Sequence, residues 1–205
     1  MNIRPNRIFI ASTLIVICMG QAGVVRADSA SAIVERFQAT LLTVMKSAEQ
    51  TSVNQRYNRL APRVRATFHV PLMTQIATGR YWSGATPEEK SAAVAAFHRM
   101  SVATLATLFD GYSGEVFSVS GERPGPSKTT VVITKLTKTD NSHVDIAYVA
   151  RQFDGTWRLI DVVVDNGISE LKVRRSEYNQ VLKKQGMTGL IKLLNEKANA
   201  LMTQE

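Results

Sequence analysis

The sequence predicts one α+β domain, in which amino-terminal helices are followed by a four-stranded, twisted antiparallel sheet and then by carboxy-terminal helices. Two observations lead to this fold class. Apolar residues recur at the three- to four-residue period of an amphipathic helix from position 30 to 109, and again after position 169. Between positions 115 and 165 the period changes to two, and short segments rich in Gly, Asn and Asp separate the apolar runs, as in a β-meander. No repeat or linker interrupts this order, so residues 28–205 are expected to form a single domain.

Four helices are expected before the sheet. The apolar period places them at residues 30–47, 53–68, 71–78 and 87–109. Pro62 predicts a kink or break in the second helix, and Gly79 ends the third. The fourth has the clearest start, because Thr86 can cap it, Pro87 suits its first turn and two glutamates face the positive end of its dipole.

The four strands are expected at residues 115–120, 128–137, 143–153 and 156–165. A proline-stiffened loop at 121–127, a turn at 139–142 and a hairpin at Asp154-Gly155 join them. After the sheet, a helix is predicted to begin at Ser169, to stop near Gly186 and to resume at Thr188.

The last of these strands is unusual because both of its faces are apolar. Strict alternation places Trp157, Leu159 and Val163 on one face and Ile160, Val162 and Val164 on the other. Antiparallel strands usually have one solvated face, so we expect something to cover this strand on both sides. Asp161 is the only acid between Trp157 and Val164.

The first 27 residues have the pattern of a secretory signal peptide. Arg4 and Arg7 precede an apolar run at residues 8–19, and small residues occupy the positions that signal peptidase reads before a cut after Ala27. The apolar run is shorter than the ~20 residues that a membrane-spanning helix needs, so cleavage is favoured over an uncleaved anchor.

Cysteine and charge restrict the function further. Cys18 is the only cysteine and lies inside the predicted signal peptide, after a residue too bulky for lipoprotein processing, so the mature chain should have no disulfide and no lipid anchor. Cleavage would leave 22 of the 25 basic residues against 17 acidic ones, a net charge of +5. An exported chain without a run of basic residues is not expected to bind nucleic acid. Attraction to anionic membrane surfaces or lipid headgroups fits this charge better.

No catalytic or cofactor motif stands out. His69, His98 and His143 fall on three different predicted elements without metal-ligand spacing, so no metal site is expected. Ser113 lies in Gly-Tyr-Ser-Gly but follows a helix, whereas a nucleophile elbow follows a strand. No phosphate-binding loop is present, and no cofactor is expected. Asp161 is the one candidate acid or base; a carboxylate bonded to nearby backbone or to an arginine is the favoured reading.

Three stretches of the sequence resemble one family. They are GRYWSGATPEEKSAAVAAFHRM, FDGYSGEVF and GTWRLIDVVVDNGISELKVRRSEYNQVLKKQGMTGLIKLL. The third contains Trp157, Asp161 four residues later, the triplet Gly167-Ile168-Ser169 before a helix, and Ser176-Glu177-Tyr178 within that helix. Over about residues 37–194 the chain resembles the MlaC, or toluene-tolerance, family of periplasmic lipid-binding proteins.

The spacing between Asp161 and Gly167 is one residue longer than expected for the phospholipid-carrying members. In this spacing, and in its ISEL, RRSEY and FDGYSGE segments, the chain is most similar to the hopanoid-associated HpnM-like branch. The resemblance therefore leaves two cargoes open, a phospholipid or a hopanoid.

The resemblance implies a non-enzymatic carrier, expected to be a monomer, that buries a lipid in an apolar cavity between the sheet and the helices. Such carriers work in the periplasm, contribute to the lipid asymmetry of the outer membrane, and exchange lipid with an inner-membrane complex, either an ABC transporter with an MCE-domain ring or an RND-type exporter. Physically, each exposed methylene costs about 0.8 kcal/mol in water, so the cavity must bury nearly the whole tail.

The residues expected on the cavity wall come from the fourth helix, the loop after it, the last two strands and the segment beyond. They are Leu105, Phe109, Tyr112, Ile146, Tyr148, Ile160, Val162, Val164 and Ile168. Each of them could instead be ordinary core. Two other functions stay open: a small enzyme of cone-shaped α+β fold acting on an apolar substrate with Asp161 as acid or base, and a secreted domain that binds only protein.

Overall fold

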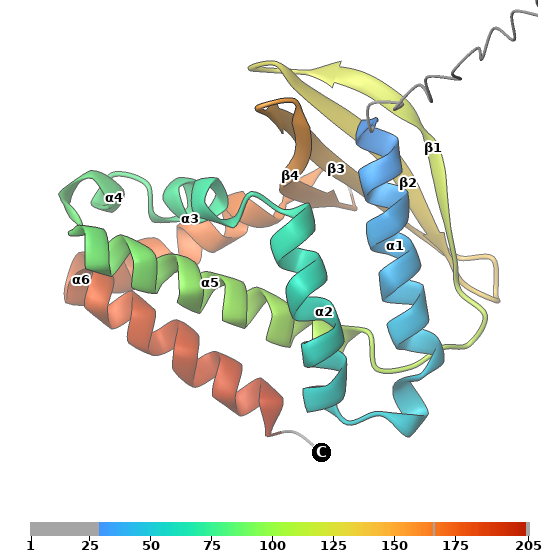
Figure 1. The fold of residues 1–205 in the computed structure, drawn as a ribbon, viewed down its shortest axis with the longest axis horizontal. Coiled ribbons are helices and arrows are strands. Elements are labelled where there is room, and N and C mark those ends of the chain that lie inside the picture. Colours follow the sequence, from blue (N-terminus) through green and yellow to red (C-terminus); the bar gives the residue numbers. More distant parts are fainter. Residues whose placement is uncertain (1–28, 166, 204–205) are drawn as a thin grey trace, which may run out of the picture.

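The computed structural model describes residues 29–165 and 167–203. The predicted signal peptide, with its cleavage site at Ala27 and Cys18, and also Asn166 lie outside the described residues. The described chain has the predicted α+β order (Figure 1). Its helices are α1 (Ala30–Lys46), a 3-10 turn (Ala48–Gln50), α2 (Val53–Thr67), α3 (Val70–Thr78), α4 (Tyr81–Gly84), α5 (Pro87–Leu108) and α6 (Glu170–Met202), and its strands are β1 (Val116–Gly125), β2 (Thr129–Thr137), β3 (His143–Phe153), β4 (Thr156–Val164) and β5 (Ile168–Ser169).

The helix α5 begins where its capping side chain predicts. At α5, the Thr86 hydroxyl accepts from the Glu89 amide while the Glu89 carboxylate accepts from the Thr86 amide, so two otherwise unpaired donors are satisfied. Pro62 does not break α2, which continues to Thr67. The break predicted near Gly186 is present inside α6, where this glycine has φ 64° and ψ −163°, a conformation that costs other residues free energy.

The sheet has five strands rather than the four expected, in the antiparallel order β1-β2-β3-β4-β5. The additional strand, β5, is only two residues long, too short to produce a period in the sequence. The loop expected at 121–127 is also wrong, because β1 stays paired as far as Gly125 after an extra residue at Ser120. Pro124 is tolerated there because β1 is an edge strand.

A β-bulge at Ile160 corrects the predicted faces of β4. Asp161 pairs with Val149 and Leu159 with Ala150, which leaves Ile160 as one extra residue in β4. Because the bulge resets the alternation, Leu159 shares a face with Val162 and Val164, not with Val163. The face beneath the helices is therefore the continuous apolar one.

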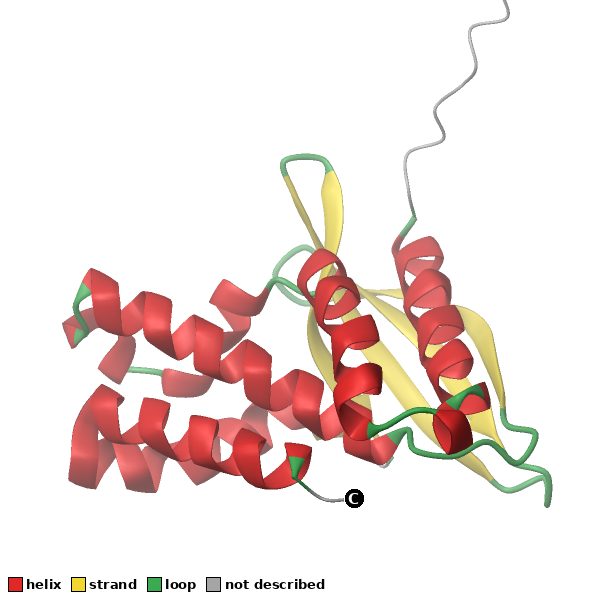
Figure 2. Cartoon of the chain, turned by 60° about the horizontal axis from the view of Figure 1, so that its bottom comes forward, coloured by secondary structure: helices red, strands yellow, loops and turns green. Residues whose placement is uncertain are grey.

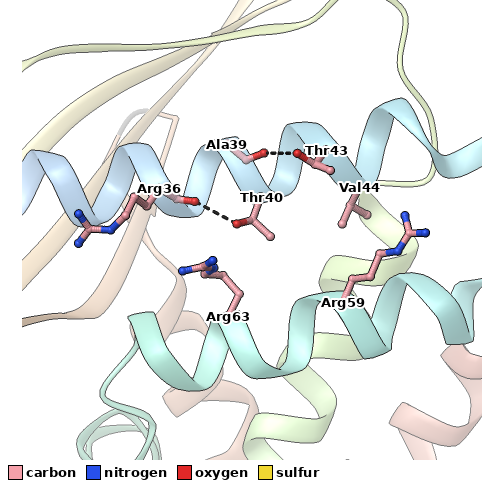
Figure 3. Close-up of a pocket in the computed structure, with 7 residues that line it drawn as sticks. All are labelled: Arg36, Ala39, Thr40, Thr43, Val44, Arg59 and Arg63. Carbon is pink, nitrogen blue, oxygen red and sulfur yellow. Dashed lines mark hydrogen bonds between the residues drawn. The ribbon is translucent and has the colours of Figure 1, made fainter.

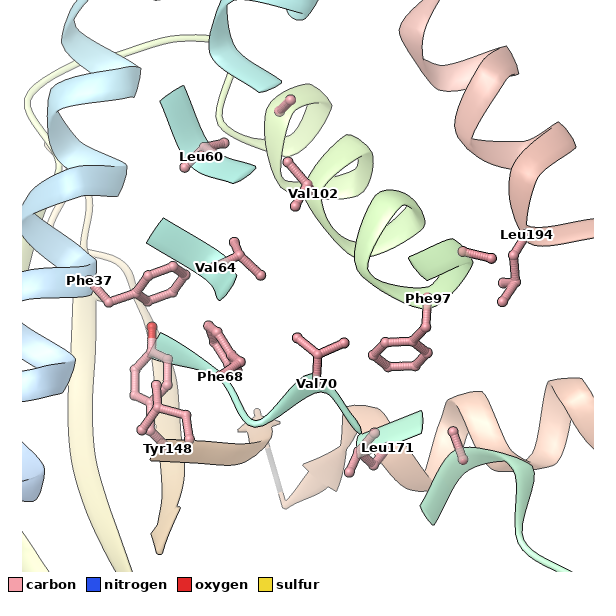
Figure 4. Packing of buried hydrophobic residues seen from close by; sticks show 14 of the residues in the cluster. Phe37, Leu60, Val64, Phe68, Val70, Phe97, Val102, Tyr148, Leu171 and Leu194 are labelled. Atoms are coloured by element: carbon pink, nitrogen blue, oxygen red, sulfur yellow. The ribbon is translucent and has the colours of Figure 1, made fainter. Parts of the chain in front are cut away.

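The helices gather on one side of the sheet (Figure 2). α1 lies across one sheet face and contacts β1 to β4 (Figure 1). The helices α2, α3, α5 and α6 pack against one another, and α2 also packs against α1. At the centre, the Phe37 ring meets the Phe68 ring edge-on at 5.0 Å and the Tyr148 ring at 6.3 Å (Figure 4). Aromatic side chains thus pack between α1, α2 and the sheet, and the cavity stays a prediction. Within the described residues, no helix combines the length and apolarity needed to cross a membrane.

Candidate functional site

Asp161 joins the sheet to the start of α6. Its Oδ2 accepts from the Ser169 hydroxyl at 2.6 Å, and its Oδ1 accepts from the backbone amides of Val162 at 2.8 Å and Leu171 at 3.1 Å. Ser169 in turn caps α6 by accepting from the Lys172 amide at 3.1 Å. Both carboxylate oxygens are therefore used, and the structural reading of Asp161 is the one that the geometry supports.

The three histidines are not brought together. His69 accepts from the Leu72 amide at the start of α3, and its ring stacks on Phe153 at 4.1 Å. His98 is buried with Nε2 3.1 Å from the Ala61 carbonyl oxygen, so Nε2 carries the proton. His143 lies at the start of β3, beside Asp145. Among the described residues, no cluster of three His, Cys, Asp or Glu side chains could hold a metal ion.

The predicted wall residues differ in their burial and in their position in the fold. Two cross-strand pairs, Ile146 with Val164 and Tyr148 with Val162, bring four of them together on β3 and β4. Leu105, Phe109, Val162 and Val164 are half-buried against the core, Ile146 and Tyr148 are buried in it, and Ile160 occupies the bulge. Tyr112 and Ile168 are 38% and 50% exposed, so they lie at the periphery of this set.

A row of buried polar side chains lies between α1 and the sheet. The Gln38 amide donates to the Thr134 hydroxyl at 3.0 Å, and that hydroxyl donates to the Ile146 carbonyl at 2.8 Å. Burial raises the pKa of Tyr148 to about 12, and its hydrogen bond with Gln38 opposes that shift. These buried polar groups are all satisfied, as burial requires.

A groove of about 400 Å³ lies between α1 and α2 (Figure 3). Its lining is Arg36, Ala39, Thr40, Thr43, Val44, Arg59 and Arg63. The hydroxyls of Thr40 and Thr43 donate to carbonyls of their own helix, at 3.0 and 2.8 Å, which leaves the arginines as the strong donors of the groove. Such a surface suits a ligand with both an apolar part and an anionic group.

A second hollow, of about 530 Å³, lies between the end of α3, α4 and α6. Arg80, Lys172 and Arg175 line it together with polar side chains such as Ser176 and Asn179. Arg175 packs over Gly79, where an added Cβ would lie 3.2 Å from its guanidinium.

Sequence reasoning missed the arginine groove. Arg59 and Arg63 are four residues apart and so share a face of α2, and that spacing was the available signal. The spacing does not show which element packs opposite this face of α2, because the position of α1 is decided by tertiary packing.

Two comparisons place the chain among known proteins. A solved structure of the phospholipid-binding protein from Ralstonia solanacearum, in complex with a phospholipid, matches with a TM-score of 0.74 and 20% sequence identity. The match covers 85% of this chain and 99% of that one, and shows a common fold. The sequence profile of the family described as MlaC protein matches residues 35–196, from α1 to α6. The chain therefore belongs to the MlaC protein family.

Proposed function

We propose that this protein is a periplasmic carrier, acting without covalent chemistry, that binds the apolar part of a phospholipid or hopanoid in an internal cavity. The observation that carries the proposal is the family match over residues 35–196. The lipid-bound state of the structural relative supports it, because a fold shared over 99% of that chain accommodates a phospholipid there.

The cavity is proposed to form where half-buried apolar residues meet the core. Leu105 on α5 and Phe109 directly after it, with Val162 and Val164 on β4, pack against the central cluster without being fully enclosed by it. A lipid tail can replace these contacts with its own methylenes, each worth about 0.8 kcal/mol when buried. Ile146 and Tyr148, the cross-strand partners of Val164 and Val162, would continue this lining, and Ile160, Tyr112 and Ile168 are the remaining predicted wall residues.

The proposed route and location follow from the predicted export signal and the family. After cleavage behind Ala27, residues 28–205 would act as a monomeric domain that shuttles lipid between membrane complexes. The receiving inner-membrane complex would be an MCE-domain ABC transporter or an RND-type exporter. The spacing between Asp161 and Gly167 favours the HpnM-like branch of the family.

Mass spectrometry of lipids that co-purify with the natively expressed protein tests the proposal. We expect near-stoichiometric phospholipid or hopanoid, and the same lipid in Asp161→Asn if this residue is structural. A protein that purifies empty and takes up no lipid from vesicles would contradict the carrier function. Turnover of an apolar substrate, lost in Asp161→Asn, would instead favour an enzyme.

A further inference from the structure

The groove between α1 and α2 has the two chemical features of an amphiphile site. Beneath it, Val44 is 1% exposed and belongs to the same buried cluster as Leu41 and Leu60, so the floor of the groove is the outer side of the core. Three arginine side chains also line the groove, and none of the described residues that line it is acidic.

The two arginines of α2 lie on either side of the apolar floor. Arg63 extends toward Thr40 of α1, and Arg59 extends past Val44 (Figure 3). Arg59 donates to the neutral Ser47 hydroxyl at 2.7 Å, and within residues 29–165 and 167–203 no carboxylate forms an ion pair with Arg59 or Arg63. Two positive charges that line one groove and form no ion pair within the described residues favour the binding of an anion in that groove.

We propose that this groove binds the phosphate of a bound phospholipid, with Arg59 and Arg63 as its ligands and the tails directed between α1 and α2 toward the core. The inference rests on the proposed carrier function and selects one cargo class: of phospholipid and hopanoid, the charge of the groove favours the lipid that carries a phosphate. Arginine suits this role because its planar fork can donate two hydrogen bonds to one phosphate.

The second basic hollow fits less well. Ser176, Asn179, Thr78 and Tyr81 make much of its lining polar, and Arg80 already donates to the Tyr81 hydroxyl at 3.2 Å. It therefore provides a matched control, since Arg80→Gln/Lys172→Gln removes the same charge from a basic hollow elsewhere.

The experiment measures uptake from vesicles of phosphatidylglycerol, of phosphatidylcholine, or of phosphatidylcholine containing a hopanoid polyol without phosphate. Protein is separated from vesicles by sedimentation, and its lipid is quantified by mass spectrometry. Arg59→Gln/Arg63→Gln should bind phosphatidylglycerol about tenfold more weakly than the wild type, since each exposed charge pair contributes up to about fivefold. The loss should be smaller for phosphatidylcholine, absent for the hopanoid, and reduced at about 0.5 M salt because screening weakens exposed pairs.

The control variant should stay within about twofold of the wild type, and circular dichroism should show all variants folded. Equal phosphatidylglycerol binding by wild type and Arg59→Gln/Arg63→Gln would overturn the headgroup site and leave the carrier function standing, as would equal losses in the control. A wild type that takes up the hopanoid alone would overturn the phosphate assignment. Failure of the wild type to take up any lipid would instead refute the carrier function itself.

Discussion

The carboxylate of Asp161 and the hydroxyl of Ser169 lie 2.6 Å apart, and through this bond the strand β4 is tied to the first turn of the longest helix. The same Ser169 oxygen accepts from the Lys172 amide and so caps α6, and the Asp161 carboxylate also accepts from the Leu171 amide. Asp161 thus holds the first turn of α6 against the sheet through two hydrogen bonds.

Asp161→Asn should destabilise the protein by about 1–3 kcal/mol without changing its fold, because an amide cannot accept from all the donors that surround this carboxylate. Urea unfolding of Asp161→Asn, Ser169→Ala and the double variant measures the effect. The two losses should be strongly non-additive, since the residues share one network. Additive losses would show that they act independently.

Leu105→Glu should leave the protein folded but remove most of its bound lipid, because a carboxylate on a cavity wall would face the tail unpaired, at a cost of several kcal/mol. Leu108→Glu is the matched control, since Leu108 lies three residues further along α5 and is 67% exposed. Lipid content per protein and circular dichroism are the measurements. Unfolding of Leu105→Glu would assign Leu105 to solid core.

Arg56→Lys should destabilise the protein by about 1–3 kcal/mol although the charge is kept. The buried Arg56 donates from Nε to the Ala106 carbonyl at 2.8 Å and from Nη1 to the Thr51 carbonyl at 2.6 Å, so it joins α2 to the end of α5. The single ammonium group of a lysine cannot reproduce these two hydrogen bonds from separate nitrogens. Thermal unfolding checks the loss, with the exposed Arg65→Lys as control; equal stability of the two variants would contradict it.

Stability should fall as the pH drops below about 6.5. Burial lowers the pKa of His98 from its ordinary 6.5; the bond to the Ala61 carbonyl opposes this, and the Arg65 charge adds to it. The unfolded chain therefore binds a proton that the folded chain excludes, until the pH reaches the lower, folded-state value. His98→Gln, which can still donate to Ala61, should show a weaker decline in urea unfolding between about pH 7.5 and 5. An equal loss of stability in the wild type and in His98→Gln would show that another group causes the pH dependence.

At alkaline pH the buried Tyr148 should make stability fall as the pH rises, the opposite direction from that of His98. Burial raises the pKa of Tyr148 from 10.0 to about 12, so the unfolded chain loses its proton first. Its contribution is complete below pH 10 and is lost, by up to about 1.4 kcal/mol per pH unit, as the pH rises toward 12. Tyr148→Phe should be less stable than the wild type at pH 7 and should narrow that gap above pH 10. A stability difference between the two proteins that does not change with pH would contradict the raised pKa of Tyr148.

Local signals predicted most of the helices and strands. The Thr86-Pro87 start and the Gly186 break lie where capping and backbone preference place them, because both act within a few residues. The bulges at Ser120 and Ile160 could not be predicted in this way, since register is decided by the partner strand. The two-residue β5 is likewise defined only by its pairing with β4.

In the candidate site, too, local sequence signals identified residues but did not show which of them the fold brings together. The strand pattern led to Asp161 and the family motif to Ser169, but their contact required the fold to bring β4 and α6 together. The arginine groove depends on which faces of α1 and α2 oppose each other, and no local pattern encodes that. The wall residues on β4 were chosen from an alternation that the bulge interrupts, and the role of all the wall residues in lipid binding stays a prediction.

The bulge at Ile160 also makes β4 tolerant of a change in length. Ile160 has no partner on β3, and the residues on either side, Leu159 and Asp161, pair with the adjacent Ala150 and Val149. If Ile160 were deleted, the two halves of the strand would join in regular alternation, and every paired side chain would keep both its partner and its face. The chain can therefore shorten by one residue at this position without turning the apolar face of the sheet outward.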